Sequence, residues 1–451
     1  MVYARALRAL ERKFMRVRVP PSAQFMLNKK SIDAVSKSNF GKTFKRPLYS
    51  SYCFSNIPKT IISLLNGDSE IALPLDSLPR LMGKKYQKVV FLFVDAFGWK
   101  FFEKYEDRYP SLQRFVKNGV VSKITSQFPS TTSVQVTSAN TGLSVGESGV
   151  YEWFYYEPKL DAVIAPLLFS YARDEGRDTL KATGIDPKKL YPTQTVYNTL
   201  KEKGVKSYVF PQSDFTKSPY NLVMNEGITY SLPFGTVAEG LTLLSDAIVD
   251  EKDKAYFFFY YGKIDTMGHE YGPESRAFES EIDVFFTALE KIFFKYIEDK
   301  SPDTLILLSA DHGQTRVYPE KTIYLNKELP NIAEFFKTTK KGDPIVPAGS
   351  CRDMFLHVKE GRIMELKNKL KELLKGEAEV YETDFLIKEG FFGKKEPSDA
   401  FKSRVGNLVI LPYRGEAVWW YEKDVFEQKH IGHHGGLTPE EMEIPLLALS
   451  I

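Results

Sequence analysis

The sequence predicts an α/β fold, with a mostly parallel central sheet and helices on both faces of that sheet. Three short apolar runs, at residues 89–94, 256–261 and 304–309, lack the polar alternation of a half-exposed strand. Such runs are typical of strands that are covered on both faces. Between two of them, apolar residues recur every three or four positions along 282–296, as in an amphipathic helix. Alternation of this kind indicates an open sheet whose sites lie at the carboxyl ends of the strands.

The first element in the chain is expected to be a basic, partly disordered arm over residues 1–60. This segment holds thirteen Lys or Arg but only two acids, Glu11 and Asp33, whereas the rest of the chain holds more acids than bases. A basic arm can contact an anionic surface such as nucleic acid or lipid, or it can be a solvated leader without a partner. We therefore expect at most a weak anionic-surface contact here.

Composition sets the broad class of protein. The 451 residues are 43% hydrophobic and 26% charged, which is ordinary globular usage and excludes a fibrous or disordered chain. No run of 18 apolar residues occurs, and basic residues interrupt the first 20 positions where a secretory signal would need an apolar stretch. The only two cysteines, Cys53 and Cys351, fit a reducing compartment. The expected location is cytoplasmic.

A strand, a turn and a helix follow one another around residue 130. A strand is expected at 120–127, then the turn Phe128-Pro-Ser-Thr-Thr-Ser-Val-Gln135, then a helix that ends at Gly142. This arrangement presents a hydroxyl beside free backbone N–H groups, which suits an anion. Thr132 is a poor nucleophile alone, but a bound divalent cation would lower the pKa of its hydroxyl. The alternative is an ordinary helix cap with satisfied hydroxyls.

Carboxylates and a histidine stand where two of the predicted strands end. Asp95 directly follows the run at 89–94, and Asp311-His312-Gly313 follows the run at 304–309. The carboxyl ends of parallel strands meet at one edge of a sheet, so we expect these side chains to lie close together. Imidazole and carboxylate together are the ligands that suit Zn²⁺ and related ions.

Two further segments carry the same ligand types in a chain that has only six histidines. Asp265-Thr-Met-Gly-His269 places a carboxylate and an imidazole one helical turn apart, so both face the same way. His434 is followed by two glycines. A single pair of this kind is usually a surface pair, but the three segments together favour a metal site.

Residues 313–430 predict an inserted α+β cap, which leaves 86–312 and 431–451 as the catalytic core. The insert contains strand candidates at 353–358 and 407–411. Between them lies a basic amphipathic helix, with its apolar face at Ile363, Leu366, Leu370 and Leu373.

The order and spacing of these motifs resemble the alkaline phosphatase superfamily, and within it the type I phosphodiesterase/nucleotide pyrophosphatase family. The matching segments are Asp95 after its strand, Phe128-Pro-Ser-Thr-Thr132 with Thr141-Gly142, Asp265-x-x-x-His269 with Gly272-Pro273, Asp311-His312-Gly313, and Gly432-x-His434-Gly-Gly. The resemblance spans roughly residues 86–451.

The resemblance implies a two-metal centre and a covalent mechanism. One ion would be held by Asp265, His269 and His434, and the other by Asp95, Asp311 and His312. Zn²⁺ is the expected metal and Mn²⁺ the alternative. Thr132 aligns with the nucleophile of the family and would form a phospho-threonine intermediate. Gln135 stands where the family often has Asn, and its amide would donate to a phosphate oxygen.

Substrate binding is expected in the aromatic run at 151–156 and in the cap. Tyr151 and Trp153 could stack on a nucleobase, although core packing is an equal alternative. Arg352 could bind a phosphate, although a structural ion pair is at least as good an interpretation.

The expected function is therefore metal-dependent hydrolysis of phosphodiester or nucleotide pyrophosphate bonds in a small substrate. Three alternatives keep the same scaffold: a phosphomonoesterase, a phosphonate hydrolase and a phospho-head-group transferase. A fourth is a non-catalytic protein that binds an anionic surface through its basic arm.

Overall fold

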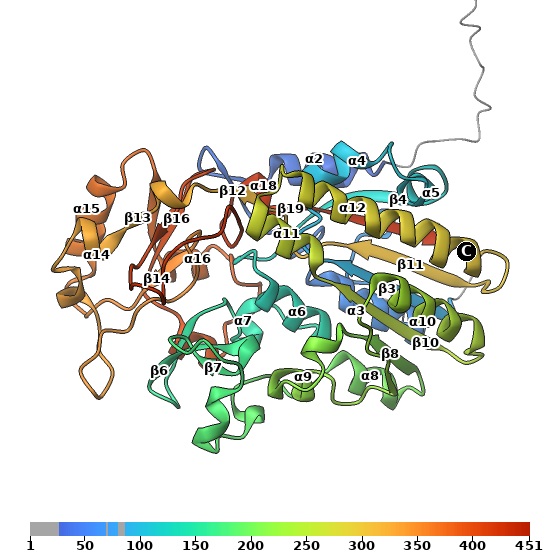
Figure 1. Cartoon of the computed structure of the whole chain (residues 1–451), viewed down its shortest axis with the longest axis horizontal. Coiled ribbons are helices and arrows are strands. Elements are labelled where there is room, and N and C mark those ends of the chain that lie inside the picture. Colours follow the sequence, from blue (N-terminus) through green and yellow to red (C-terminus); the bar gives the residue numbers. More distant parts are fainter. Residues whose placement is uncertain (1–26, 69–70, 80–85) are drawn as a thin grey trace, which may run out of the picture.

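The computed structural model describes residues 27–68, 71–79 and 86–451, and its centre is a seven-stranded sheet in the order β4-β19-β11-β3-β10-β8-β9 (Figure 1). The strands are β3 (Lys88–Val94), β4 (Val120–Thr125), β8 (Lys206–Phe210), β9 (Tyr230–Ser231), β10 (Ala255–Tyr261), β11 (Thr304–Ser309) and β19 (Glu443–Ser450). β19 runs antiparallel to both of its neighbours, and the other neighbouring pairs are parallel. The predicted fold class, with a mostly parallel sheet, is confirmed.

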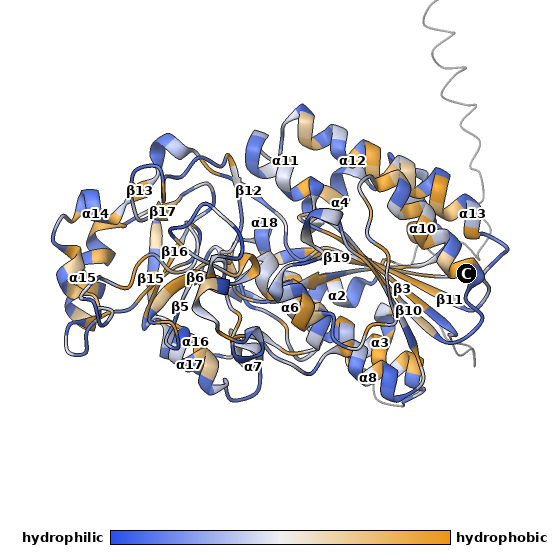
Figure 2. Cartoon of the chain, turned by 60° about the horizontal axis from the view of Figure 1, so that its bottom comes forward, coloured by the Kyte–Doolittle hydropathy of each residue, from blue (hydrophilic) through white to orange (hydrophobic). Residues whose placement is uncertain are grey.

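The three apolar runs of the sequence form the middle of this sheet. β3 lies between β10 and β11, with Lys88 beside both Ala255 and Thr304. Every residue of β3 and β11 is buried, which is why these strands show no polar alternation. Figure 2 shows apolar residues along these strands and on the sides of the helices that cover them.

Helices cover both faces of the sheet (Figure 1). One group comprises α3 (Asn56–Asn66), α6 (Thr132–Thr141), α8 (Val196–Glu202) and α9 (Pro219–Met224). The other comprises α4 (Trp99–Tyr105), α5 (Pro110–Asn118), α10 (Val237–Asp250) and α12 (Arg276–Ala288), which continues through a π-helical turn (Leu289–Phe294) into α13 (Lys295–Ile297). The helical repeat predicted at 282–296 lies in this continuous helix, where Ile282 and Phe285 face the core.

The described part of the predicted arm packs against the sheet. It forms α2 (Lys29–Lys37), β1 (Asn39–Phe40) and β2 (Phe44–Lys45) before α3. The amide of Asn28 donates to Val121 at 2.8 Å, and the amide of Phe54 donates to Thr125 at 2.9 Å. Residues 27–60 therefore extend the core at β4. Residues 1–26 lie outside the described residues, so the predicted disorder and anionic-surface contact stay predictions.

The cap is joined to the core by a short ribbon, in which β12 (Thr315–Arg316) pairs with β18 (Gly432–His433). Its main sheet has the antiparallel order β14 (Met354–Leu356), β16 (Leu408–Pro412) and β15 (Ala378–Glu382). β14 and β16 lie at the two predicted strands. The other cap elements are α14 (Leu325–Glu328), α15 (Ile363–Leu373), α16 (Thr383–Lys388), α17 (Asp399–Arg404), and the paired β13 (Ile323–Tyr324) and β17 (Val418–Trp419).

A second small sheet comes from residues predicted as core and lies beside the cap. It follows α7 (Val145–Ser148) and contains β5 (Tyr155–Glu157), β6 (Ala162–Ala165) and β7 (Ser170–Tyr171). The amide of Gly349 in the cap donates to the carbonyl of Phe154 at 2.7 Å. Across residues 27–68, 71–79 and 86–451, no helix is both long and apolar enough to cross a membrane.

Candidate active site and metal centre

Asp95, Asp311 and His312 meet at the carboxyl edge of the sheet, as their positions after β3 and β11 predict. The Nε2 atom of His312 lies 3.5 Å from Asp95 Oδ1 and 3.3 Å from Asp311 Oδ2. All three side chains are buried. Asp95 Oδ1 and Asp311 Oδ2 accept no hydrogen bond from any described residue. Buried polar atoms are rarely left without partners, so these two oxygens fit a cation between them.

Asp265, His269 and His434 form a second group beside the first. α11 (Lys263–Tyr271) follows β10 and carries Asp265 and His269 on one face, and β18 brings His434 to them. His269 Nε2 lies 3.2 Å from Asp265 Oδ2 and 3.2 Å from His434 Nε2. The His312 ring stacks on the His434 ring at 3.5 Å, and ligand atoms of Asp265, His312 and His434 lie within 4.8 Å of one another. The two groups therefore adjoin.

Backbone carbonyls orient all three imidazoles in the same way. The Nδ1 atoms of His269, His312 and His434 contact the carbonyls of Gly432, Gly313 and Ser130 at 2.8, 3.0 and 3.0 Å respectively. A carbonyl only accepts, so each Nδ1 carries the hydrogen and each Nε2 keeps a lone pair. The three Nε2 atoms point into the cluster. This is the arrangement that carbonyl partners impose on metal-ligating histidines.

The electrostatics of the cluster also fit a cation. Burial raises the pKa of Asp95 well above its usual range, and the nearby carboxylates of Asp311 and Asp265 raise it further. A cation between the carboxylates would relieve the repulsion at Asp95.

Thr132 lies at the junction of the two groups. It is the first residue of α6, in the strand–turn–helix arrangement that the sequence predicts. Its Oγ1 atom is 3.2 Å from His312 Nε2. The first intrahelical bond runs from the amide of Gln135 to Thr131, so the amides before Gln135 have no partner within the helix.

The turn before Thr132 is fastened to the loop that carries His434. The Ser130 amide donates to Gly435 at 3.1 Å, and the Ser130 hydroxyl donates to Gly436 at 2.7 Å. Gly435 has a φ of +125°, and a Cβ there would lie 2.6 Å from the hydroxyl of Ser350. Glycine is therefore required at the point where the two loops pair.

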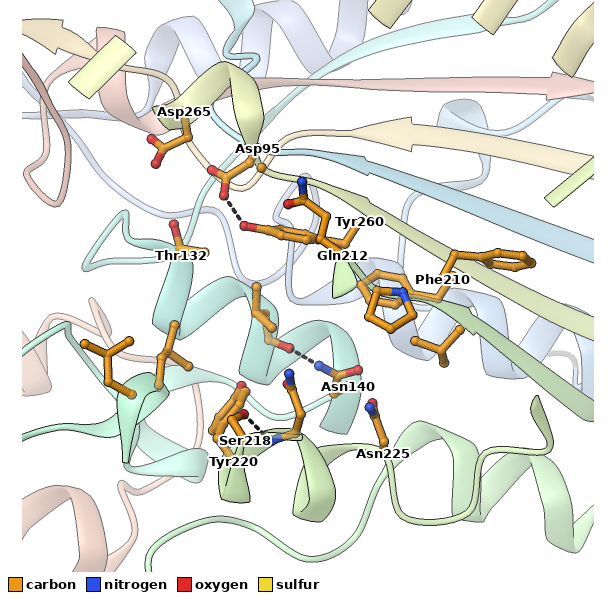
Figure 3. A pocket seen from close by; sticks show the side chains of 18 of the residues that line it. Asp95, Thr132, Asn140, Phe210, Gln212, Ser218, Tyr220, Asn225, Tyr260 and Asp265 are labelled. Atoms are coloured by element: carbon orange, nitrogen blue, oxygen red, sulfur yellow. Dashed lines mark hydrogen bonds between the residues drawn. The ribbon is translucent and has the colours of Figure 1, made fainter. Parts of the chain in front are cut away.

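Two cavities meet at Thr132. The first, which we name the sheet-side cavity, has a volume of about 270 Å³. Its lining includes Asn140, Phe210, Gln212, Tyr220, Asn225 and Tyr260 (Figure 3). The second, the cap-side cavity, has a volume of about 360 Å³, and its lining includes Glu152, Phe154, Trp419, Phe426, Glu427 and His433. Thr132, Trp153 and Asp265 line both cavities, so the two cavities adjoin at the cluster.

The four residues predicted to bind substrate behave differently from one another. Trp153 lines both cavities. Gln135 lines neither: it is buried, it accepts from Gln127 at 2.9 Å and it donates to Ser126 at 2.9 Å. Both ends of its amide are thus engaged by buried partners and it lines neither cavity, so the predicted contact is corrected.

Tyr151 and Arg352 are also corrected, because both are buried structural residues. The Tyr151 ring stacks on Tyr155 at 5.3 Å, and its hydroxyl donates to the Arg404 carbonyl at 3.3 Å. Arg352 pairs with Glu441, with Nε 2.9 Å from Oε1. Its two terminal nitrogens are also engaged, by that carboxylate and by cap carbonyls. No donor of Arg352 is left for a phosphate.

Sequence reasoning missed two residues that orient the metal-ligand candidates. The hydroxyl of Tyr260 donates to Asp95 Oδ2, and Gln314 Nε2 donates to Asp265 Oδ1 at 2.6 Å. The backbone leaves room for Gln314 only because residue 268 is Gly, where a Cβ would lie 2.0 Å from Gln314 Oε1. The available signal was position: Gln314 directly follows Asp311-His312-Gly313, and Tyr260 lies near the end of its strand.

Comparisons with known proteins agree with this arrangement. The family model for type I phosphodiesterase/nucleotide pyrophosphatase matches residues 89–437, which is most of the chain. The match includes Thr132 and all six metal-ligand candidates. The chain belongs to this family. It is therefore a phosphodiesterase/nucleotide pyrophosphatase-like hydrolase of the alkaline phosphatase superfamily, acting on a phosphoester or nucleotide. The family is metal-dependent, in keeping with the two ligand groups.

Solved structures of other proteins have the same fold as this chain. An inactive form of murine ectonucleotide pyrophosphatase/phosphodiesterase 5 in complex with AMP has a TM-score of 0.60 and 19% identity, covering 80% of this chain and 88% of that one. The human protein of that name has a TM-score of 0.59 and is 17% identical, and the match covers 80% of this chain and 87% of that one. Phosphonoacetate hydrolase from Sinorhizobium meliloti, in complex with phosphonoacetate, has a TM-score of 0.57 and is 15% identical. That match covers 82% of this chain and 92% of the hydrolase.

Proposed function

We propose that this protein hydrolyses phosphodiester or nucleotide pyrophosphate bonds through a covalent phospho-threonine intermediate on Thr132, beside a site for two divalent ions. The observation that carries the proposal is the position of Thr132 Oγ1, 3.2 Å from His312 Nε2 and between two adjoining groups of metal-ligand candidates.

The metal ligands would divide as two sets of three. Asp265, His269 and His434 would hold one ion, and Asp95, Asp311 and His312 would hold the other. Imidazole nitrogens and carboxylate oxygens suit Zn²⁺, with Mn²⁺ as the alternative. When bound, the ions supply positive charge that lowers the pKa of a nearby hydroxyl and stabilises negative charge on phosphoryl oxygens.

The protein's own residues account for the rest of the reaction. Thr132 Oγ1 loses its proton to solvent and attacks phosphorus, a new O–P bond forms, and the bond to one bridging oxygen breaks. The alcohol or phosphate that leaves takes up a proton from solvent as its basicity requires. Water then attacks phosphorus, releases the phosphomonoester and restores the Thr132 hydroxyl. The amides at the start of α6 have no partner within the helix, so they would stabilise negative charge on the phosphoryl oxygens during both steps.

Two cavities support a substrate with two arms. A phosphodiester has one group on each side of phosphorus, and Thr132 lies where the sheet-side and cap-side cavities meet. A monoester would use one cavity and leave the other without a ligand group. The geometry therefore favours diesters and phosphoanhydrides over monoesters.

The test compares hydrolysis of bis(p-nitrophenyl) phosphate and p-nitrophenyl phosphate by protein loaded with Zn²⁺ or Mn²⁺. We expect diester preference, and we expect Thr132→Ala to lower kcat by at least about 1,000-fold, as loss of a nucleophile does. Thr131→Ala is the matched control, because that hydroxyl is one residue away, and it should retain most of the activity. A preference for the monoester, or an active Thr132→Ala, would contradict the proposal.

A further inference from the structure

Two buried carboxyls outside the metal-ligand cluster come together where the cap meets the core. Glu152 lies in the loop before β5, and Asp353 lies directly before β14 of the cap. Both side chains are fully buried. The segments that carry them are paired, because the amide of Gly349 donates to the carbonyl of Phe154 at 2.7 Å. A carboxyl from the core and a carboxyl from the cap therefore share one enclosed space.

The two carboxyls gather on one side of Gly435. The position that a Cβ would occupy on this glycine lies 2.6 Å from Ser350 Oγ, 2.8 Å from Asp353 Oδ1 and 3.2 Å from Glu152 Oε1. The Ser350 hydroxyl donates to Asp353 Oδ1 at 2.5 Å, and the same hydroxyl lies 3.3 Å from the carbonyl oxygen of His434. The carboxyls therefore pack against the loop that carries His434.

One of the two carboxyls must carry a proton. Glu152 forms a hydrogen bond with Asp353, and an ionised carboxylate can only accept. Glu152 Oε1 and Asp353 Oδ2 receive no hydrogen bond from any N–H or hydroxyl group of the described residues. Burial raises the pKa of Glu152 to about 8 and that of Asp353 well above its usual range. The pair therefore keeps a proton at neutral pH, and this proton joins the cap to the core.

The other neighbours of the pair do not replace that proton. The amide of Trp153 donates to Glu152 Oε2 and leaves Oε1 without a donor. The guanidinium of Arg352 is next to Asp353 in sequence, but it is engaged by Glu441 and by cap carbonyls. The hydrogen bond between the carboxyls is thus the direct polar link between the two side chains.

The loop beside the pair also fastens the turn that carries Thr132. The amide and the hydroxyl of Ser130 donate to the carbonyls of Gly435 and Gly436, at 3.1 and 2.7 Å respectively. Thr132 follows two residues later as the first residue of α6. A displaced loop would therefore move both His434 and the turn, and a reaction of this kind tolerates little displacement of the reacting groups.

We propose that Glu152 and Asp353 form a hydrogen-bonded carboxyl pair that positions the loop at 434–436 and, through it, Thr132. Both are positioning residues, which act through the loop rather than on the substrate. This inference rests on the proposed function, because Thr132 is the attacking group that the pair would hold in place.

Substitutions of similar size separate the hydrogen bond from packing. Glu152→Gln keeps a donor for Asp353, whereas Glu152→Met fills the space without one. Hydrolysis of bis(p-nitrophenyl) phosphate is measured at saturating Zn²⁺, and kcat is expressed per Zn²⁺-binding molecule counted by calorimetric titration. We expect kcat of Glu152→Gln to stay within about threefold of the natural value. Glu152→Met should lower kcat by about 10- to 100-fold and change KM by less than about twofold.

A second pair of variants keeps the test decisive if Glu152→Met fails to fold. Asp353→Asn keeps the hydrogen bond and Asp353→Leu removes it, and we expect the same contrast in kcat. The double variant Glu152→Met/Asp353→Leu should lose no more than about twofold beyond either single change, because residues that act as a unit are not additive. Glu328→Met, at an exposed acid of the cap on α14, is the control and should retain the natural kcat.

The outcomes separate the two proposals. Equal kcat values for Glu152→Gln and Glu152→Met, or for Asp353→Asn and Asp353→Leu, would overturn the carboxyl pair, and Thr132-dependent turnover would leave the proposed function standing. A rise in KM without a fall in kcat would also overturn the pair, because it would show a direct contact with the substrate. Turnover that does not need Thr132 would overturn the proposed function itself.

Discussion

The two cavities beside Thr132 differ in how they are built and in what they can hold. The sheet-side cavity lies among the ends of β8 and β10 and the helices α6 and α9, and it presents amides such as Asn225 together with Lys263. The cap-side cavity is formed by the insert and the loop before β5, and it presents aromatic rings and Glu427. The edge of the sheet positions the reacting groups, whereas segments added outside the sheet supply selectivity on one side.

This comparison predicts that damage at the junction affects all substrates equally. Asp95→Ala, or removal of metal by a chelator, should lower kcat/KM about 100-fold or more, since bound ions contribute several kcal/mol of charge stabilisation. The ratio of kcat/KM values between two different diesters should not change. Asp107→Ala, at an exposed acid far from the cluster, is the control. A variant that lost activity toward only one of the substrates would show that the substrates do not react at the same junction.

Positioning residues should act on the metal more than on substrate choice. Gln314→Ala removes the donor to Asp265, and we expect metal affinity to fall about 10- to 100-fold, as loss of outer partners of metal ligands typically causes. Calorimetric titration with Zn²⁺ measures this without substrate. Gln194→Ala removes an exposed amide elsewhere and should change nothing. An unchanged affinity in Gln314→Ala would mean that Asp265 needs no orienting donor.

The protonation of Glu152, a buried carboxyl that lines the cap-side cavity, can be tested by pH. The pKa of Glu152 is raised to about 8 from 4.5, so the folded state holds its proton more tightly than the unfolded state does. The stability that this proton supports is complete below about pH 4.5 and is lost as pH rises toward 8. Glu152→Gln keeps the shape of the protonated carboxyl. Its Tm should exceed that of the natural protein by about 2–5 °C at pH 8 and by little at pH 5.

A Tm difference between Glu152→Gln and the natural protein that stays constant from pH 5 to pH 8 would contradict this reasoning. It would mean that Glu152 titrates normally and carries a negative charge in the lining of the cap-side cavity at neutral pH.

The smallest expected effect belongs to the sheet-side cavity. Asn225→Ala removes one amide from its lining, and loss of one neutral hydrogen bond costs about 1 kcal/mol. We expect KM for the p-nitrophenyl ester of thymidine 5′-monophosphate to rise about fivefold. Asn118→Ala, at an exposed helix end, is the control. An unchanged KM in Asn225→Ala would mean that Asn225 does not contact the substrate.

The sequence predicted the reacting edge well, because linear position determines it. Asp95 and Asp311 each follow a strand of a parallel sheet, so the fold brings them together without further information. The spacing of Asp265 and His269 likewise predicted one helical face, and α11 presents both to His434.

The side chains around that edge could not be predicted in the same way. Arg352 looked able to bind phosphate, but only the fold shows that Glu441 and cap carbonyls engage all of its donors. Gln135 and Tyr151 point into the protein for the same reason: burial and partner choice depend on segments that are distant in sequence. The cap-side cavity needs rings near residues 154 and 419, whose proximity no local pattern indicates.

A search for the covalent intermediate on Thr132 tests the proposed mechanism without a model of the natural substrate. Protein loaded with Zn²⁺ is mixed with bis(p-nitrophenyl) phosphate, quenched in acid during turnover, digested and analysed by mass spectrometry. We expect a p-nitrophenylphosphoryl group on Thr132 that appears with release of one p-nitrophenolate and is absent from Thr132→Ala. Steady turnover with no adduct at any time, or an adduct on Thr131, would contradict it.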